Sequence, residues 1–244
     1  MEIDTATAAR FLSALTGDAA HTFQTFAEAG GSKALNRIMH GSLEQRSMAL
    51  QSLNLEGAGV FVMVNAGDRM GRRAENVTRA RALFVDLDGA PVKPVLSCPL
   101  PPRIVVESSP GKWHCYWPIA DLPLGRFTDA QKALALRFDG DPKVHDRARV
   151  MRLPGFLHNK GAPFQTRLVE ASDAPPLTWH EMVEAFGLQD RMRLPDTIPD
   201  GQRNDTLFKM AIVSARKGVP EVEQARKALA VNSNNCHPPL PASP

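Results

Sequence analysis

The sequence predicts an α+β protein in which a mixed or antiparallel sheet with flanking helices is followed by a small all-α domain. Several strand-like segments occur without the regular strand–helix alternation of a doubly wound parallel sheet. A Ser-Pro-Gly-Lys turn joins two of these segments as a hairpin. After a polar stretch punctuated by prolines, apolar residues recur at helical spacing. Together these features favour a mixed sheet domain ahead of a helical one.

Three helices of the main domain are predicted from apolar spacing and from their first residues. The first covers residues 4–15, where apolar side chains fall on one face. The second covers residues 42–54, where Ser42 and Gln45 can form a capping box. The third covers residues 178–186, which begin with the same kind of box and end before a glycine. These helices flank the predicted sheet.

The strands are predicted from apolar or alternating runs bounded by turn residues. They are HTFQTFA at residues 21–27, GVFVMV at 59–64, LFVDLD at 83–88, the hairpin arms RIVVES at 103–108 and WHCYWP at 113–118, and FQTRLVEA at 164–171. The domain boundaries follow from the change in composition. We expect a main domain over residues 1–190, a linker over 191–199 and a helical domain over 200–244.

The bulk composition is that of an ordinary globular protein. Of the 244 residues, 43% are hydrophobic, and the net charge of +3 permits nucleic-acid binding without arguing for it. Three scattered cysteines without CxxC spacing argue against a disulfide framework and a structural zinc site. They fit a reducing, cytoplasmic compartment. Because no apolar run approaches the ~18 residues that span a bilayer, no membrane partner is expected.

Two acidic residues stand at the apolar end of a predicted buried strand, in RARALFVDLDGA. Side chains alternate along a strand, so Asp86 and Asp88 share a face about 7 Å apart. Two buried carboxylates repel each other, and one takes up a proton unless a cation lies nearby. Mg²⁺ accepts one or two carboxylates together with substrate phosphate oxygens. The pair indicates a metal site, unless the strand simply ends in solvent and Asp88-Gly89 starts a turn.

A second interpretation of this stretch stays open. FVDLDGA is similar to the first motif of haloacid-dehalogenase-type phosphatases, where the first aspartate is a nucleophile. Those motifs continue with threonine where this chain has Ala90, and they begin a Rossmann-like alternation that this sequence lacks. DGDP at residues 139–142 can pass for their late acidic motif.

Groups suited to anionic oxygens follow on the hairpin, in SSPGKWHCYW. Ser109, Lys112 and His114 surround a glycine turn, where an ammonium, an imidazole and backbone N–H groups can meet phosphate. A lone histidine is more often structural, but this one lies just past the lysine-bearing turn. The hairpin therefore indicates a phosphate-binding element.

A third acid and two arginines follow in VHDRARVMRLPGFLHNK. Asp146 supplies the acid, and Arg149 and Arg152 stand three residues apart. An acid beside two guanidinium groups is most often a surface ion cluster. Combined with the DxD strand and the hairpin, it indicates a metal ligand beside clamps for phosphate.

The order of these three motifs is similar to the archaeo-eukaryotic primase superfamily, and most closely to the RepB-like primases of plasmids and phages. The resemblance spans residues 11–170 and includes VNAG before the acidic strand. IPDGQRNDTLFKMAIVSARKG, with VNSNNCHPPL, resembles the small helical domain that often follows such catalytic domains. The resemblance implies an RRM-like sheet with the catalytic acids on its open face.

Roles for particular residues are also implied by the resemblance. The implied catalytic residues are Asp86, Asp88, Asp146 and His114, of which the three acids would hold metal. Asp141 is not excluded as the third acid. The implied nucleotide-binding residues are Ser109, Lys112, His114, Arg149 and Arg152. Contacts to nucleic acid or to the initiating nucleotide are implied for Asn65, Lys160, Arg203 and Asn204.

We therefore expect a DNA-directed primase, or primase-polymerase, that joins nucleoside triphosphates on single-stranded DNA with two Mg²⁺ or Mn²⁺ ions. The chain stops soon after CHPPL without a GxxxxGK[ST] motif, so a longer parent protein and a fused or associated replicative helicase are hypotheses. Two alternatives remain. One is a dehalogenase-type phosphohydrolase with Asp86 as nucleophile; the other is a non-catalytic single-strand-binding module of a replication initiator, which would not need all three acids.

Overall fold

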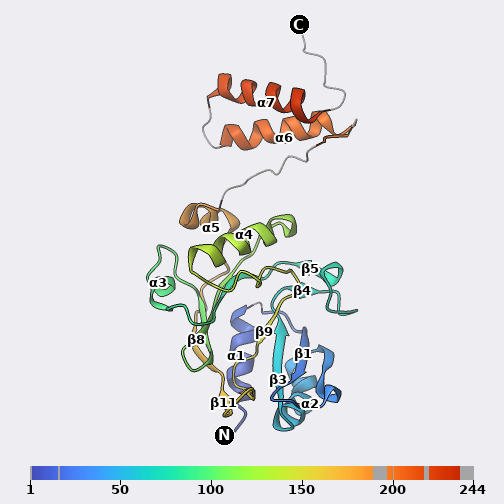
Figure 1. Ribbon diagram of the computed structural model, residues 1–244, viewed down its shortest axis with the longest axis vertical. Helices are drawn as coiled ribbons and strands as arrows, with labels where there is room; N and C mark the ends of the chain where they lie inside the picture. Colours follow the sequence, from blue (N-terminus) through green and yellow to red (C-terminus); the bar gives the residue numbers. More distant parts are fainter. Residues whose placement is uncertain (1, 16, 189–196, 200, 217–219, 237–244) are drawn as a thin grey trace. The chain divides into compact units, whose positions relative to one another are not determined.

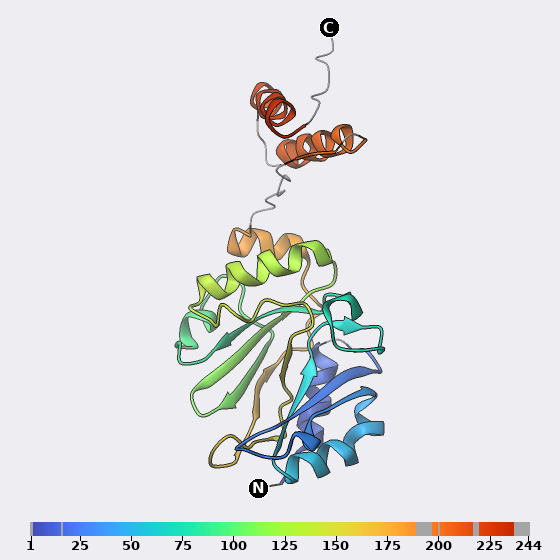
Figure 2. The same ribbon diagram turned by 45° about the vertical axis from the view of Figure 1, so that its right-hand side comes forward.

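The computed structural model describes residues 2–15, 17–188, 197–199, 201–216 and 220–236 (Figures 1 and 2). The chain divides into two compact units, Met1–Leu188 and Gln189–Pro244. Antiparallel sheets with helices make up the first unit and helices the second, so the α+β prediction is confirmed. The predicted linker lies outside the described residues except for 197–199.

Two four-stranded antiparallel sheets form the first unit, where the sequence predicted one. The A sheet has the strand order β2 (Arg37–Gly41), β1 (His21–Ala27), β3 (Ala58–Met63) and β9 (Val150–Arg152). The C sheet has the order β12 (Arg167–Ala171), β7 (Ile104–Ser109), β8 (Lys112–Pro118) and β6 (Ala82–Leu87). Two short ladders add β4 (Ala66–Gly67) with β5 (Val77–Arg79), and β10 (Leu157–His158) with β11 (Phe164–Gln165).

The helices of the first unit are α1 (Thr5–Leu15), α2 (Leu43–Leu55), α3 (Lys93–Leu96), α4 (Leu124–Arg137) and α5 (Trp179–Phe186), with 3₁₀ turns at Lys33–Leu35 and Ala74–Asn76. The predicted helix starts are confirmed. Ser42 accepts from the N–H of Gln45 at the start of α2, and Thr178 accepts from that of Glu181 at the start of α5. Helix α4 was not predicted, because Pro123 offers it no side-chain cap and its first turn carries no acid.

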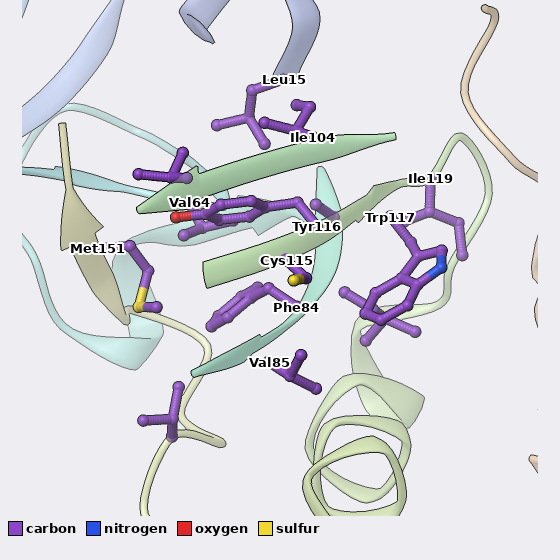
Figure 3. Close-up of a cluster of buried hydrophobic side chains, with 14 of the residues drawn as sticks. Leu15, Val64, Phe84, Val85, Ile104, Cys115, Tyr116, Trp117, Ile119 and Met151 are labelled. Atoms are coloured by element: carbon purple, nitrogen blue, oxygen red, sulfur yellow. The ribbon is translucent and has the colours of Figure 1, made fainter. Parts of the chain in front are cut away.

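The C sheet is packed on both faces, which fixes the direction of its side chains (Figure 3). On one face, the ring of Tyr116 meets that of Phe11 from α1 edge-on, with centroids 5.4 Å apart. On the other face, Trp117 stacks on Phe138 at the end of α4 and contacts Phe186 of α5. This alternation along β8 places His114 on the same face as Tyr116.

The outer edge of β6 is covered by a buried side chain of α4. Gln131 accepts the N–H of Phe84 at 3.2 Å, and its amide donates to the carbonyls of Phe84 at 2.6 Å and Val144 at 3.2 Å. Two residues further along the strand, the carbonyl of Asp86 accepts the N–H of Asp141 at 2.9 Å. These bonds fix the end of β6 against the 139–144 loop.

The prediction of one continuous strand over FQTRLVEA is wrong, because the segment is divided into two strands at Thr166. The hydroxyl of Thr166 donates to the carbonyls of Leu153 and Phe156, at 3.1 and 2.8 Å. The backbone of Thr166 also forms hydrogen bonds with the loop at residues 153–156. The halves therefore pair with different strands, β11 with β10 and β12 with β7.

The second unit contains the predicted helix pair, α6 (Arg203–Arg216) and α7 (Glu221–Asn235), the latter opened by Pro220. A parallel bridge joins Ile198 to Cys236. Within the part of the chain that the structure describes, no helix has the length and apolar character needed to cross a membrane.

Candidate active site

A cavity of about 320 Å³ lies where the two four-stranded sheets approach each other. The C sheet and its hairpin turn contribute Asp86, Asp88, Ser108, Ser109, Lys112 and His114. The A sheet contributes Phe61, Val150, Met151 and Arg152, strand β10 contributes His158, and the adjoining loops add Val144, Arg149 and Lys160. Seven of the residues that the motifs single out thus line one cavity: Asp86, Asp88, Ser109, Lys112, His114, Arg149 and Arg152. Lys160 joins them.

Asp86 and His114 face each other across neighbouring strands. They are paired in the β6–β8 register, with the Nε2 of His114 3.6 Å from Oδ1 of Asp86. Burial, followed by the carboxylates of Asp141 and Asp88, raises the pKa of Asp86 to about 6. Burial, followed by the charge of Arg152, lowers the pKa of His114 to about 3, so the imidazole is neutral at pH 7. A cation close to Asp86 would restore its ionised form.

Asp88 stands at the mouth of the cavity, just beyond the end of β6. Its side chain is 61% exposed and forms an ion pair with Lys112 of the hairpin turn. The hydrogen bond from Lys112 lowers the pKa of Asp88. The turn itself has Gly111 at φ +73°, as a type II turn requires at its third position. The Ser-Pro-Gly-Lys turn therefore places an ammonium beside the outer acid.

The two candidates for the third acid occupy different surroundings. Asp141 is bonded through its backbone to Asp86 and contributes to the raised pKa of that residue. Asp146 is half-exposed and pairs with Arg149 at 2.7 Å, and it lines a neighbouring cavity instead. Asp141 is thus the candidate whose backbone borders Asp86, whereas its carboxylate accepts the N–H of Lys143 at 2.8 Å, and neither candidate lines the first cavity.

Arg152 enters the cavity from the A sheet and is held by a buried acid. Its guanidinium is paired with Glu28 at 2.5 Å and lies 4.7 Å from the ring centroid of Phe61. Both charged side chains are buried, and Glu28 also accepts the N–H of Asn159 at 2.7 Å. Gly59 makes room for the pair, since a Cβ there would lie 2.7 Å from the carboxyl carbon of Glu28. The arginine is thus fixed in orientation before any ligand binds.

His158 and Lys160 follow the Pro-Gly turn in the chain and also line the cavity. The Nδ1 of His158 lies 3.2 Å from the carbonyl of Ser108, whereas its Nε2 is buried without a hydrogen-bond partner among the described residues. Lys160 is exposed at the rim, where its charge helps to lower the pKa of Asp88. An anionic ligand would meet both groups.

Three residues with implied nucleic-acid roles lie elsewhere. Asn65 is fully buried, accepts the N–H of Arg81 at 3.0 Å and donates to the carbonyl of Arg147 at 2.9 Å, which indicates a structural role. Arg203 and Asn204 belong to the second unit, where the former is buried and the latter exposed. Neither cavity of the first unit described here includes them.

The donor set fits a hard divalent cation that shares its coordination with a substrate. Among the described residues, no group of three or more histidine, cysteine, aspartate or glutamate side chains is arranged to hold a metal ion unaided. Asp86 and Asp88 nevertheless supply two carboxylates in one cavity, and Mg²⁺ commonly takes one or two carboxylates plus phosphate oxygens. The raised pKa of Asp86 is the mark of a carboxylate that a cation would stabilise.

Sequence reasoning missed Glu28, Phe61, Ser108 and His158. The first two lie far from the motifs in the chain: the pairing of β3 with β9 places Phe61 beside Arg152, and Arg152 donates a hydrogen bond to Glu28. His158 was visible in LPGFLHNK, and its position between the turn and Lys160 was the available signal.

Two family models match the chain over nearly its whole length. Residues 29–193 match the RepB DNA-primase N-terminal domain, and residues 194–243 match the domain described as primase C terminal 1. None of the curated proteins compared with the chain matches it in sequence.

Solved structures of primases share the fold. The primase-polymerase domain of cyanophage S-2L is 20% identical with a TM-score of 0.63, over 76% of this chain and 100% of that chain. The catalytic domain of primase RepB′ in complex with initiator DNA is 21% identical with a TM-score of 0.56, over 75% of this chain and 92% of that one. Primase RepB′ itself is 19% identical with a TM-score of 0.57, over 92% and 85%.

Proposed function

The chain belongs to the RepB DNA-primase family, and on this basis we propose that it synthesises short primers on single-stranded DNA from nucleoside triphosphates. The predicted resemblance to RepB-like primases is confirmed by the family models. One observation carries the proposal of activity at the cavity. Asp86 and His114 from one sheet and Arg152 from the other line the same space, as nucleotidyl transfer from a nucleoside triphosphate to a 3′-hydroxyl demands.

The carboxylates are proposed to hold divalent cations. Asp86 and Asp88 are the metal ligands, and Asp141 is preferred to Asp146 as the third acid because it borders Asp86. Bound Mg²⁺ or Mn²⁺ would activate the attacking 3′-hydroxyl and stabilise the leaving pyrophosphate. The hydrogen bond that the N–H of Asp141 donates to the carbonyl of Asp86 keeps the two chain segments together.

The cationic side chains are proposed to bind the triphosphate. Arg152 is rigid because Glu28 and Phe61 hold it, so it offers its remaining N–H groups without loss of side-chain entropy. Neutral His114 would donate a hydrogen bond to a phosphate oxygen rather than a full charge. Lys112 would exchange its ion pair with Asp88 for a phosphate when metal binds that acid.

The helical unit at residues 200–244 is proposed to assist template binding or to hold the initiating nucleotide. The match of residues 194–243 to a primase C-terminal domain supports this, as does the exposed position of Asn204. Arg203 is buried, so we assign it to the packing of the unit.

A template-dependent synthesis assay tests the proposal. The protein is incubated with labelled nucleoside triphosphates, Mg²⁺ or Mn²⁺ and single-stranded DNA. We expect oligonucleotide products whose sequence follows the template, and we expect them to vanish in Asp86→Ala. Asp129→Ala, which removes an exposed acid of α4, is the control and should retain full activity. Release of free phosphate from small phosphoesters without template would instead establish the phosphohydrolase, and DNA binding without any product would establish the binding module.

A further inference from the structure

We propose that a second cavity, adjoining the candidate active site, binds one base and its phosphate from single-stranded DNA. The inference rests on the proposed primase function, and it assigns a place to the template. The cavity measures about 300 Å³ and is lined by Phe26, Phe61, Arg72, Asp146, Arg149 and Val150. None of the three motifs in the sequence includes Phe26 or Arg72.

The second cavity is continuous with the first through a common wall. Phe61, Arg149 and Val150 line both. A template strand must run past the nucleotide that is being copied, so its next unpaired base has to lie beside the nucleotide cavity. A volume of about 300 Å³ is at the lower end of ligand pockets, which suits one unpaired base better than a base pair.

Two aromatic rings lie on the face of the A sheet that is turned away from the main core. The register pairs Gln24 with Phe61, and Phe26 with Gly59, so these side chains share one face, while Phe23 and Val62 pack into the core on the other. Phe26 and Phe61 meet edge-on, with centroids 5.3 Å apart, and both are half-buried. The guanidinium of Arg152 lies 4.7 Å from the Phe61 centroid and that of Arg72 lies 5.8 Å from the Phe26 centroid, so Phe26 is the more open ring, and a base would stack on it beside Arg72.

The cationic groups of this cavity are positioned before DNA binds. Nε of Arg72 donates to Gln24 at 3.0 Å and its NH1 to the carbonyl of Ala148 at 3.4 Å, with the guanidinium carbon 5.8 Å from the Phe26 centroid. Arg149 has a buried Nε without a hydrogen-bond partner in the described part of the chain. Asp146 pairs with Arg149, so two cations and one acid give the lining a net positive charge.

The Phe26 ring, the positive charge of the lining and the wall shared with the first cavity together favour single-stranded nucleic acid as the ligand. A base stacks on an aromatic ring regardless of its sequence, and an adjacent guanidinium meets the phosphate or extends the stack. An incoming triphosphate would carry more negative charge than two guanidinium groups beside an acid can neutralise. The first cavity, with its carboxylates, lysines and Arg152, suits that ligand instead.

The test measures binding of a fluorescent single-stranded oligonucleotide by anisotropy for four variants of the full chain. Phe26→Ala should weaken binding by about 5- to 150-fold, the effect of one lost base stack. Arg72→Gln should weaken it and should lower the salt dependence of log K by about 0.7. Ile38→Ala and Arg73→Ala are matched controls, since Ile38 is an exposed apolar residue on the same sheet face and Arg73 an exposed neighbour outside the cavity. Both controls should bind as wild type does.

Two further measurements separate the possible failures. Phe26→Leu keeps the apolar bulk, so a folded Phe26→Leu protein with weakened DNA binding assigns the effect to the ring. Nucleotide binding, followed with a fluorescent triphosphate, should be unchanged in Phe26→Leu. DNA affinity equal to wild type in both Phe26→Leu and Arg72→Gln would overturn this inference while leaving the proposed function intact. A wild-type protein that forms no template-dependent product would instead overturn the proposed function.

Discussion

The two sheets that line the cavity differ in the chemistry they supply. The C sheet brings carboxylates and a neutral imidazole at the ends of β6 and β8, whereas the A sheet brings Arg152 over an aromatic ring. Asp88 at the end of the C sheet is exposed, whereas Glu28 on the side of the A sheet is buried and accepts hydrogen bonds from Arg152 and Asn159. On the proposed function, the difference assigns two tasks: the C-sheet wall supports metal-dependent chemistry and the A-sheet wall holds a ligand. Changes to the C sheet should therefore reduce turnover, and changes to the A sheet should reduce affinity and stability.

The largest effect is expected at Asp141, the proposed third acid on the C-sheet side of the cavity. Asp141→Asn should lower the rate of dinucleotide formation by about 100-fold or more, because it removes a charge beside Asp86 at the metal-binding wall. Asp146→Asn removes only a half-exposed ion pair with Arg149 and should change the rate by about threefold or less. Steady-state rates at saturating nucleotide measure both variants. A larger loss in Asp146→Asn would transfer the role to that residue.

The buried ion pair of the A sheet should give the next largest effect. Glu28→Gln leaves the buried charge of Arg152 without a counter-ion, so unfolding free energy should fall by about 3–5 kcal/mol. Asp173→Asn breaks a surface pair with Arg10 and should cost less than about 1 kcal/mol. Urea denaturation compares the two. Nucleotide affinity should fall in Glu28→Gln alone; equal stability losses in the two variants would mean that the pair does not hold Arg152.

A smaller effect is expected from the residue that covers the edge of β6. Gln131→Met keeps the size and helix propensity of the side chain but leaves the N–H and carbonyl of Phe84 without their partner. The loss should be about 2–3 kcal/mol of unfolding free energy. Lys132→Met, an exposed neighbour on α4, should be within about 0.5 kcal/mol of wild type. A stability equal to that control would show that β6 does not depend on α4 for its edge.

The smallest effect concerns pH and a residue remote from the catalytic chemistry. Burial, followed by the charge of Arg81, lowers the pKa of His21 to about 4. The unfolded chain binds its proton near pH 6.5, so stability is full above that value and falls as the pH drops toward 4. Because of His21, the unfolding free energy should fall by about 2 kcal/mol between pH 7 and pH 5. His21→Phe should flatten the pH dependence of the denaturation midpoint over this range, and an unchanged slope would contradict the assignment.

Local signals in the sequence predicted much of the fold. Capping boxes at Ser42 and Thr178 and the Pro-Gly turn before Lys112 are short-range features, and each is found where it was expected. The edge strand β2 escaped notice because its residues are exposed or half-buried and lack an apolar run. The three-residue β9 is too short to carry a pattern. The division into two sheets depends on pairings across the whole domain, which no local pattern specifies.

The candidate site was also predictable only where local signals in the sequence specify it. Alternation predicted that Asp86 and Asp88 share a face, but His114 lies beside Asp86 through the pairing of β6 with β8, which only the family resemblance had implied. Glu28 reaches Arg152 across 124 positions of sequence, and only the folded chain reveals that contact. The proposal of Asp141 over Asp146 rests on the backbone bond from Asp141 to Asp86, which sequence spacing cannot disclose.

Binding of Mn²⁺, followed by the loss of its free electron paramagnetic resonance signal, tests most directly whether the C sheet holds the catalytic cation. In the presence of a non-hydrolysable nucleoside triphosphate, the wild-type protein should bind Mn²⁺, and Asp86→Asn should bind it at least about tenfold more weakly. Glu28→Gln, on the other wall, should lose affinity for the nucleotide but still bind Mn²⁺ once the nucleotide is saturating. Undiminished Mn²⁺ binding by Asp86→Asn would contradict the assignment of the carboxylate wall to metal.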